Sequence, residues 1–155
     1  MLEKLNKRKA AIIYSSQSAY SRSLQETFTT NVVGDGGEIV SESDISQANF
    51  NPADTLQVAK DSGAEILVFL NDSKTANKAY LLMQLNELNL PILGGDGLYK
   101  PQTLQVAGKN AVGLVISVPW HILSKNNNSD FPNAARRLWG GDAVSYTHLT
   151  LPTKA

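Results

Sequence analysis

The sequence predicts an α/β protein built on an open parallel sheet with helices on both faces. Three observations support this fold class. Short apolar runs rich in β-branched residues recur along the chain, segments with helical spacing of apolar residues stand between them, and glycine or proline marks many of the changes. Strands that alternate with helices pair in parallel through right-handed crossovers, which place the helices on the two faces of the sheet.

The first strand is expected at Lys9–Tyr14, where a continuous apolar run indicates burial on both faces. A helix is expected over Ser18–Val33, because apolar side chains recur there at four-residue intervals. These side chains are Tyr20, Leu24, Phe28 and Val32. Gly34 stands where a helix favours a glycine at its end, and a second, shorter strand is expected at Glu38–Ser43.

The same alternation continues through the middle of the chain. Pro52 opens a helix that Gly63 ends, because proline suits the first turn of a helix. The apolar run Glu65–Leu70 is the strongest strand candidate in the sequence. A helix with a broad apolar face is expected over Thr75–Asn89.

The last third of the chain adds two strands and two short helices. The strands are expected at Pro91–Gly94 and Ala111–Val118, with a helix over Lys100–Ala107 between them and another at Phe131–Trp139. A chain of 155 residues is the size of one domain. We therefore expect a single α/β domain over residues 1–142.

Composition excludes several classes of function. The 14 Lys and Arg balance the 14 Asp and Glu, so a basic surface for nucleic acid or anionic membranes is not expected. The absence of Cys excludes disulfides, thiol catalysis and cysteine–zinc sites. No apolar run approaches the length of a membrane span, and the basic start of the chain is a poor signal peptide.

Ligands of open parallel sheets bind outside the carboxyl ends of the strands. Four segments follow strand ends here, and they are Ser15–Tyr20, Asn71–Lys74, Gly95–Tyr99 and Pro119–His121. Ser16 or Ser18 can cap the helix that follows, or this loop can contact a ligand, and the two roles are compatible. Asp72 is expected more to cap a helix than to face a cleft.

Asp96 lies in the glycine-rich turn Gly94–Gly97 at a strand end. Its carboxylate can pair with a ligand ammonium that the glycines allow to approach, or it can bond only its own backbone as an Asx-type turn. Spacing alone leaves both readings open. His121 stands without nearby metal-binding partners, and no Ser-His-Asp arrangement, P-loop or GxGxxG is present. No catalytic set, metal site or cofactor is therefore expected.

Several motifs resemble the second lobe of type I periplasmic binding proteins, and most closely the branched-chain amino-acid receptors of ABC transporters. They are AIIYSSQSAYSRSLQETF, GGEIVSES, GAEILVFL, NELNLPILGGDGLY, LQVAGKNAVGLVISVPW and FPNAARRLW, which together cover almost all of the chain between Lys9 and Trp139. The resemblance implies one Rossmann-like lobe of a two-lobed, non-catalytic receptor that closes over its solute.

The resemblance also implies site residues. Tyr20 matches a tyrosine that packs on the ligand in this family, and Asp96 matches an acid that pairs with the ligand α-ammonium. Asp72 and Ser73 stand where the family often has an aromatic pair. This departure argues against a purely aliphatic amino acid and favours a more polar solute.

The resemblance implies two macromolecular partners, the missing first lobe and an ABC-transporter permease. The ligand would be an amino acid or similar small solute, and the full-length receptor would be periplasmic or extracytoplasmic, with any signal peptide lying upstream of this chain. Residues 143–155 break the receptor-like pattern. Back-translation of Ala143–Thr153 resembles a transposon-based sequencing adapter, so this tail is expected to be non-native; a genuine terminal strand is the alternative.

Two other folds of the same class were compared with the sequence. A flavodoxin-like domain would place a flavin phosphate in the loop Ser15–Ser21, but few aromatic residues follow the strands to sandwich a flavin. A phospho-receiver domain would need acids after the first strand and a lysine after the fifth, and both are missing. The flavodoxin-like domain remains the alternative to a receptor lobe.

Overall fold

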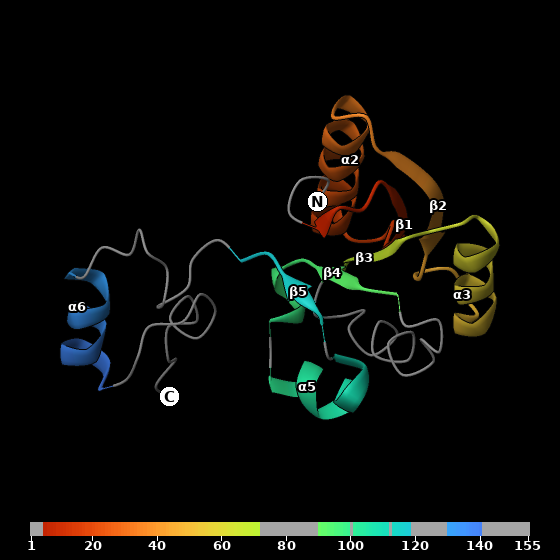
Figure 1. Cartoon of the computed structure of the whole chain (residues 1–155). Coiled ribbons are helices and arrows are strands. Elements are labelled where there is room, and N and C mark those ends of the chain that lie inside the picture. The colour runs from red at the N-terminus through yellow and green to blue at the C-terminus, as the bar shows by residue number, and fades with distance from the viewer. Residues whose placement is uncertain (1–4, 72–89, 100, 112, 119–129, 141–155) are drawn as a thin grey trace. The chain divides into compact units, whose positions relative to one another are not determined.

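The computed structural model describes residues 5–71, 90–99, 101–111, 113–118 and 130–140 (Figure 1). The chain divides into two units, Met1–Ser117 and Val118–Ala155. The strands of the first unit are β1 (Lys9–Tyr14), β2 (Glu38–Asp44), β3 (Ile66–Leu70), β4 (Ile92–Gly94) and β5 (Val115–Ile116). Its helices are α2 (Ala19–Gly34), α3 (Pro52–Asp61) and α5 (Pro101–Ala107), with the 3-10 turns η1 (Asp96–Leu98) and η2 (Gly108–Ala111).

All five strands pair in parallel, in the order β2-β1-β3-β4-β5. β3 is the central strand, and its five residues are all buried. This explains why Ile66–Leu70 is uniformly apolar, since a strand covered on both faces cannot alternate with polar residues. The predicted open parallel sheet is confirmed.

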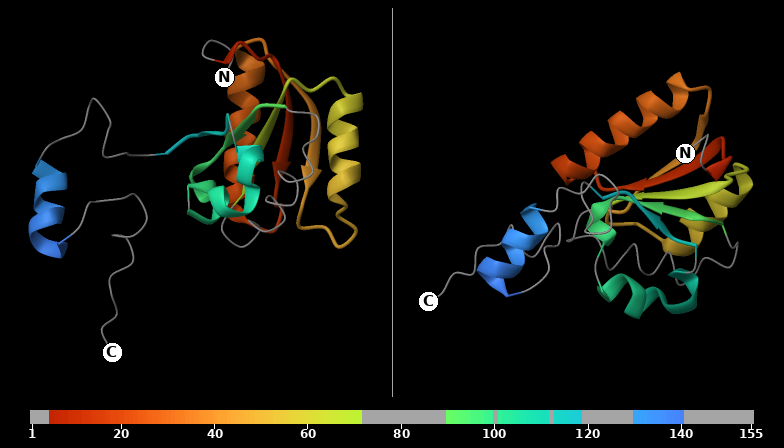
Figure 2. Two further views of the ribbon diagram at one scale, coloured as in Figure 1. Left: turned by 60° about the horizontal axis from the view of Figure 1, so that its bottom comes forward. Right: turned by 60° about the vertical axis from the view of Figure 1, so that its left-hand side comes forward.

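Helices cover both faces of the sheet, as the alternation predicts (Figure 2). On one face, Ile12, Ile66 and Val68 form a core with Leu24 and Phe28 of α2. On the other face, the core is built around Phe69 and receives side chains from α3 and α5. Its buried members are Ala11, Ile13, Ile45, Leu56, Ala59, Leu67, Phe69, Ile92, Leu98 and Ala107.

The helix boundaries follow from local capping. Ser18 is the N-cap of α2, and its hydroxyl accepts a hydrogen bond from the backbone N–H of Ser21. Asn51 caps α3 in the same way, accepting from the N–H of Ala53 at 3.0 Å, and Pro52 follows at the first helical position.

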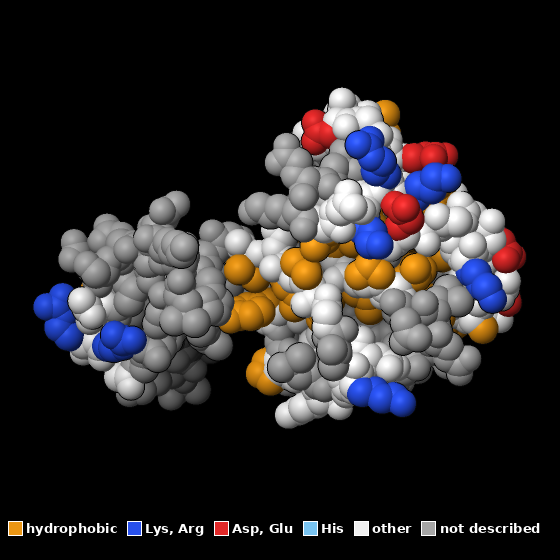
Figure 3. Space-filling view, viewed as in Figure 1, with side chains coloured by type: hydrophobic (Ala, Val, Ile, Leu, Met, Phe, Trp, Pro, Cys, Tyr) orange, Lys and Arg blue, Asp and Glu red, His pale blue; other side chains and the backbone are white. Residues whose placement is uncertain are grey.

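Charged side chains are spread over the outer surfaces of this unit, while hydrophobic side chains show near its centre (Figure 3).

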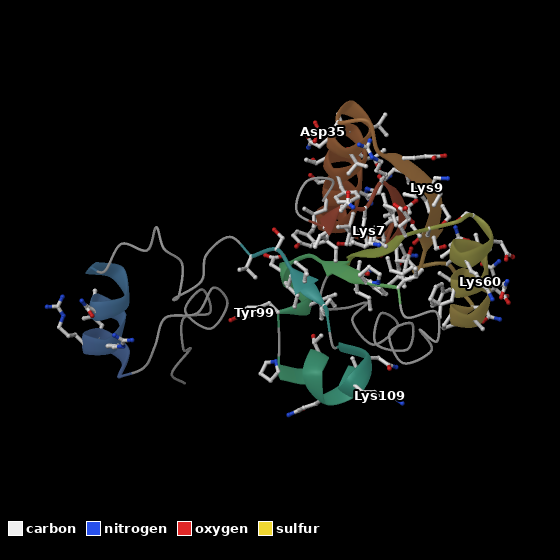
Figure 4. The ribbon with its side chains drawn as sticks, viewed as in Figure 1. Lys7, Lys9, Asp35, Lys60, Tyr99 and Lys109 are labelled. Atoms are coloured by element: carbon white, nitrogen blue, oxygen red, sulfur yellow. The ribbon has the colours of Figure 1, made fainter. Side chains whose placement is uncertain are left out.

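The amino edge of the sheet is held by one carboxylate. Glu65 accepts hydrogen bonds from the backbone N–H groups of Arg8 at 2.7 Å and Lys9 at 3.1 Å, beside the start of β1 where Figure 4 labels Lys7 and Lys9. These bonds lower the pKa of the Glu65 carboxyl. The Glu65 carboxylate therefore has a structural role at this edge.

The predicted element order is confirmed for the described residues, but the last strand is much shorter than predicted. The last strand was expected over Ala111–Val118, but Gly108–Ala111 forms a 3-10 turn and only Val115–Ile116 pairs with β4. Gly113 has a φ of +84°, which breaks an extended run before it can pair. The helix expected at Thr75–Asn89 lies outside the described residues.

The second unit contains α6 (Asp130–Trp139), within one residue of its predicted start. Gly140 ends it with a φ of +71°, and its N–H donates to the Arg136 carbonyl at 3.0 Å. Glycine adopts this left-handed conformation without strain, so it suits a helix C-terminus.

The tail 143–155 lies outside the described residues. No helix in the described parts of the chain is long and apolar enough to cross a membrane.

Candidate functional site

The carboxyl ends of three neighbouring strands meet at one edge of the sheet. Tyr14 of β1 pairs with Leu70 of β3, and Phe69 of β3 pairs with Gly94 of β4. The Gly95 N–H then donates to the Phe69 carbonyl at 3.0 Å, which carries the pairing past the end of β4. The residues that follow these strands are therefore neighbours at the edge where open parallel sheets bind ligands.

Tyr20 and Asp96 meet at this edge. The Tyr20 hydroxyl donates a hydrogen bond to Oδ1 of Asp96. Tyr20 is 40% exposed, so its ring is accessible from outside the core although it belongs to the apolar face of α2. A Cβ on Gly95 would lie 3.5 Å from the Tyr20 hydroxyl oxygen, so the tyrosine crosses directly over this glycine.

The alternative reading of Asp96 was a turn residue bonding its own backbone. Asp96 begins the 3-10 turn η1, and among the described residues its carboxylate accepts from Tyr20 and makes no bond to that turn. The carboxylate is half-buried. An anionic group that is held by one donor and keeps a second oxygen can accept further donors such as an ammonium.

Ser21 ties the start of α2 to the sheet. Its side chain is fully buried, accepts from the Ser15 N–H at 2.8 Å and donates to the Leu70 carbonyl. One hydroxyl therefore satisfies a backbone donor after β1 and a backbone acceptor at the end of β3. Because Tyr20 precedes Ser21 directly, this clamp fixes the helix turn that carries the tyrosine.

A second polar cluster stabilises the loop after β1. Asp44 accepts from the Ser16 N–H at 3.1 Å, from the Ser46 N–H at 2.9 Å and from both serine hydroxyls. Partial burial opposes ionisation of Asp44, but the hydrogen bonds from Ser16 and Ser46 outweigh it and lower the pKa of its carboxyl well below the ordinary value. The Arg22 guanidinium also donates to the Ser16 carbonyl. Ser18, not Ser16, thus caps α2.

Asn71 follows β3 directly and is fully buried. Neither Nδ2 nor Oδ1 of its carboxamide has a hydrogen-bond partner within the structure as described. Buried polar side chains are nearly always hydrogen-bonded, so such a group is exceptional.

Two of the four predicted site residues, Tyr20 and Asp96, are brought together by the fold. Asp72 and Ser73 lie outside the described residues. Sequence reasoning missed Ser21, Asp44 and Asn71. The sequence does contain an indication for Asn71, because this polar residue directly follows the strongest apolar run, at the edge where ligands bind. In the described ranges, no group of three or more His, Cys, Asp or Glu could hold a metal ion.

Comparisons with known proteins agree with this architecture. No curated protein matches the sequence. A leucine binding protein from Thermotoga maritima superposes with a TM-score of 0.70 at 18% identity, covering 91% of this chain and 41% of that one. A Desulfitobacterium hafniense ABC transporter substrate-binding protein in complex with Leu gives a TM-score of 0.68 at 17% identity, covering 94% and 41%.

A branched-chain amino acid transporter substrate binding protein from Streptococcus pneumoniae, in complex with isoleucine, gives a TM-score of 0.63 at 21% identity, covering 91% and 40%. The chain therefore spans about two fifths of the length of these structures, and the likeness shows a shared fold. Residues 1–150 match the family described as "Periplasmic binding protein". The chain belongs to the periplasmic binding protein family.

Proposed function

We propose that this chain is the second lobe of a solute-binding receptor that serves an ABC transporter. The receptor binds an amino acid or similar small polar solute between two lobes and performs no catalysis. The observation that carries the proposal is the Tyr20–Asp96 pair at the carboxyl edge of the sheet. It offers an accessible ring and a carboxylate side by side, which are the groups that an α-amino acid needs for its apolar surface and its ammonium.

Two further observations support this proposal. The superposed Desulfitobacterium hafniense and Streptococcus pneumoniae proteins hold Leu and isoleucine respectively. The chain also spans only 40 to 41% of those proteins, as one lobe of a two-lobed receptor would. The partners we propose are the first lobe and the permease of the transporter, and the compartment is periplasmic or extracytoplasmic. The flavodoxin-like alternative is not favoured by the family match.

Asp96→Asn in the full-length receptor tests the charge pairing. The substitution keeps the size of the side chain and removes its charge. Loss of one partner of a buried, hydrogen-bonded charge pair costs about 2–5 kcal/mol, or roughly 30- to 4000-fold in affinity. Calorimetric titration with a panel of amino acids should show this loss at an unchanged melting temperature.

Asp35→Asn is the matched control. Asp35 is an exposed carboxylate just beyond α2, where its backbone N–H donates to Asn31 and Val33. The affinity of this variant should equal that of the wild type. Equal affinity of Asp96→Asn and wild type, at equal melting temperature, would mean that Asp96 is a turn residue only.

A further inference from the structure

Among the residues that the structure describes, the Asn71 carboxamide is a buried polar group without a hydrogen-bond partner. Its side chain has 0% exposure, and both polar atoms lack hydrogen bonds in the part of the chain that is described. Other buried hydroxyls are satisfied: Ser21 bonds Ser15 and Leu70, and Thr103 donates to the Leu98 carbonyl at 2.5 Å. Asn71 therefore differs from Ser21 and Thr103 in that its buried polar atoms have no hydrogen-bond partner among the described residues.

The strand register places Asn71 in the middle of the candidate site. Leu70 pairs with Tyr14, so the next residues, Asn71 and Ser15, are neighbours. Phe69 pairs with Gly94, and β3 lies between β1 and β4 in the sheet, so Asn71 follows the strand that separates these two. Asn71 thus lies between the ends of β1 and β4, at the edge of the sheet where Tyr20 and Asp96 meet.

An unpaired carboxamide at this position opposes folding. A buried donor or acceptor without a partner destabilises the folded state, and an apolar side chain of the same shape would avoid that cost. The four residues before it, Leu67 to Leu70, are all apolar and fully or almost fully buried, so a leucine would continue the same environment. The carboxamide therefore needs an explanation outside the folding of the lobe.

We propose that Asn71 determines solute specificity by pairing with a solute side chain that both donates and accepts hydrogen bonds. This inference rests on the proposed receptor function. A carboxamide offers two donors and an acceptor, so a solute carboxamide can meet it with two bonds, and a hydroxyl with one. An aliphatic solute would leave it unpaired, and sites built around a polar group discriminate strongly against such analogues.

Burial adds a condition to this model. Because Asn71 is fully buried, a solute must displace the side chains over it to reach the carboxamide. The ammonium of the same solute remains at Asp96. The solute class is accordingly an amino acid with a neutral polar side chain.

Asn71→Leu in the full-length receptor tests this inference. Calorimetric titrations with L-glutamine, L-asparagine and L-threonine are compared with L-leucine and L-valine, and melting is measured alongside. The wild type should prefer the polar solutes at least about tenfold, and Asn71→Leu should abolish that preference. Its melting temperature should not fall, since an unpaired group has been removed. Asn71→Ala removes the same carboxamide without a branched side chain and should lose the preference as well.

Thr103→Val is the matched control, because it removes a buried polar group that does have a partner. It should lower the melting temperature and leave the solute preference intact. An unchanged preference in both Asn71 variants overturns the inference, and so does a fall in the melting temperature of Asn71→Leu as large as that of Thr103→Val. A wild-type receptor that binds none of the five amino acids would overturn the proposed function itself.

Discussion

The Tyr20 hydroxyl in the first turn of α2 donates a hydrogen bond to the Asp96 carboxylate in the turn after β4. The two residues are 76 positions apart, and the parallel sheet brings them to the same edge. One carboxylate oxygen of Asp96 is therefore engaged by the protein itself. A solute ammonium has to share that oxygen or use the second one.

Tyr20→Phe should change solute affinity less than Asp96→Asn does. The substitution keeps the ring that we propose packs on the solute and removes only the hydroxyl, so the carboxylate stays charged and accessible. We expect a change of less than about tenfold, because one hydrogen bond contributes about 0.5–1.5 kcal/mol. Calorimetry of the full-length receptor measures it. A loss as large as that of Asp96→Asn would show that the hydroxyl itself binds the solute.

Ser21→Ala should destabilise the lobe. The variant leaves the buried Ser15 N–H and Leu70 carbonyl without their shared partner, and an unsatisfied buried group costs about 1–3 kcal/mol. Urea unfolding followed by circular dichroism reports the difference. Ser23→Ala, at an exposed position of the same helix, is the control and should lie within about 0.5 kcal/mol of the wild type. Equal stability of the two variants would rule out the clamp.

Asp44 should make the stability of the lobe sensitive to acid. Hydrogen bonds from Ser16 and Ser46 lower its pKa in the folded state, so folding favours the ionised form. This contribution is complete above the unfolded pKa of about 3.9 and is lost as the pH falls toward the folded value. Unfolding free energies measured from pH 6 down to pH 2 should therefore fall more steeply for the wild type than for Asp44→Asn. Parallel curves would contradict this assignment.

Most of the sheet could be predicted from local sequence because β1 and β3 are buried on both faces and read as continuous apolar runs. The edge strand β5 was predicted too long, since Ala111–Val118 is apolar but Gly113 interrupts the extended run. Edge strands pair on one side only, so their length depends on backbone conformation as much as on hydrophobicity.

The candidate site could be predicted in part. Asp96 stood out as a carboxylate in a glycine-rich turn at a strand end, and Tyr20 was indicated by the family resemblance. The contact between them depends on the strand order, which places β3 beside β1 and β4 beside β3. Ser21 and Asp44 could not be predicted as clamps, because a serine near a helix start usually caps the helix and Asp44 is the last residue of an edge strand. Their roles depend on backbone groups of other strands, which only the assembled sheet brings within reach.

Gly37→Ala should destabilise the connection between α2 and β2. A Cβ at this position would lie 2.6 Å from Cγ1 of Val32, 3.0 Å from the Val32 carbonyl oxygen and 3.2 Å from that of Arg8. Two of these atoms belong to the backbone, so the strand and helix would have to separate. Thermal melting should show a loss of about 1–3 kcal/mol.

Gly34→Ala is the matched control for this effect. Gly34 is the last residue of α2, and a Cβ there meets nothing within 4 Å. Alanine favours the helical backbone, so this variant should be as stable as the wild type or more stable by up to about 1 kcal/mol. If both variants have the same melting temperature, the close packing around Gly37 does not exclude a larger side chain.

The central claim is that this chain forms one wall of a solute site that a second lobe completes. Good ligand sites bury about 70–90% of the ligand surface, and one wall cannot do so. The most direct measurement is a calorimetric titration of an amino-acid panel into the 155-residue chain and, in parallel, into the full-length receptor. We expect micromolar or tighter binding by the full-length receptor and none by the chain alone. Micromolar binding of an amino acid by the chain alone would contradict it.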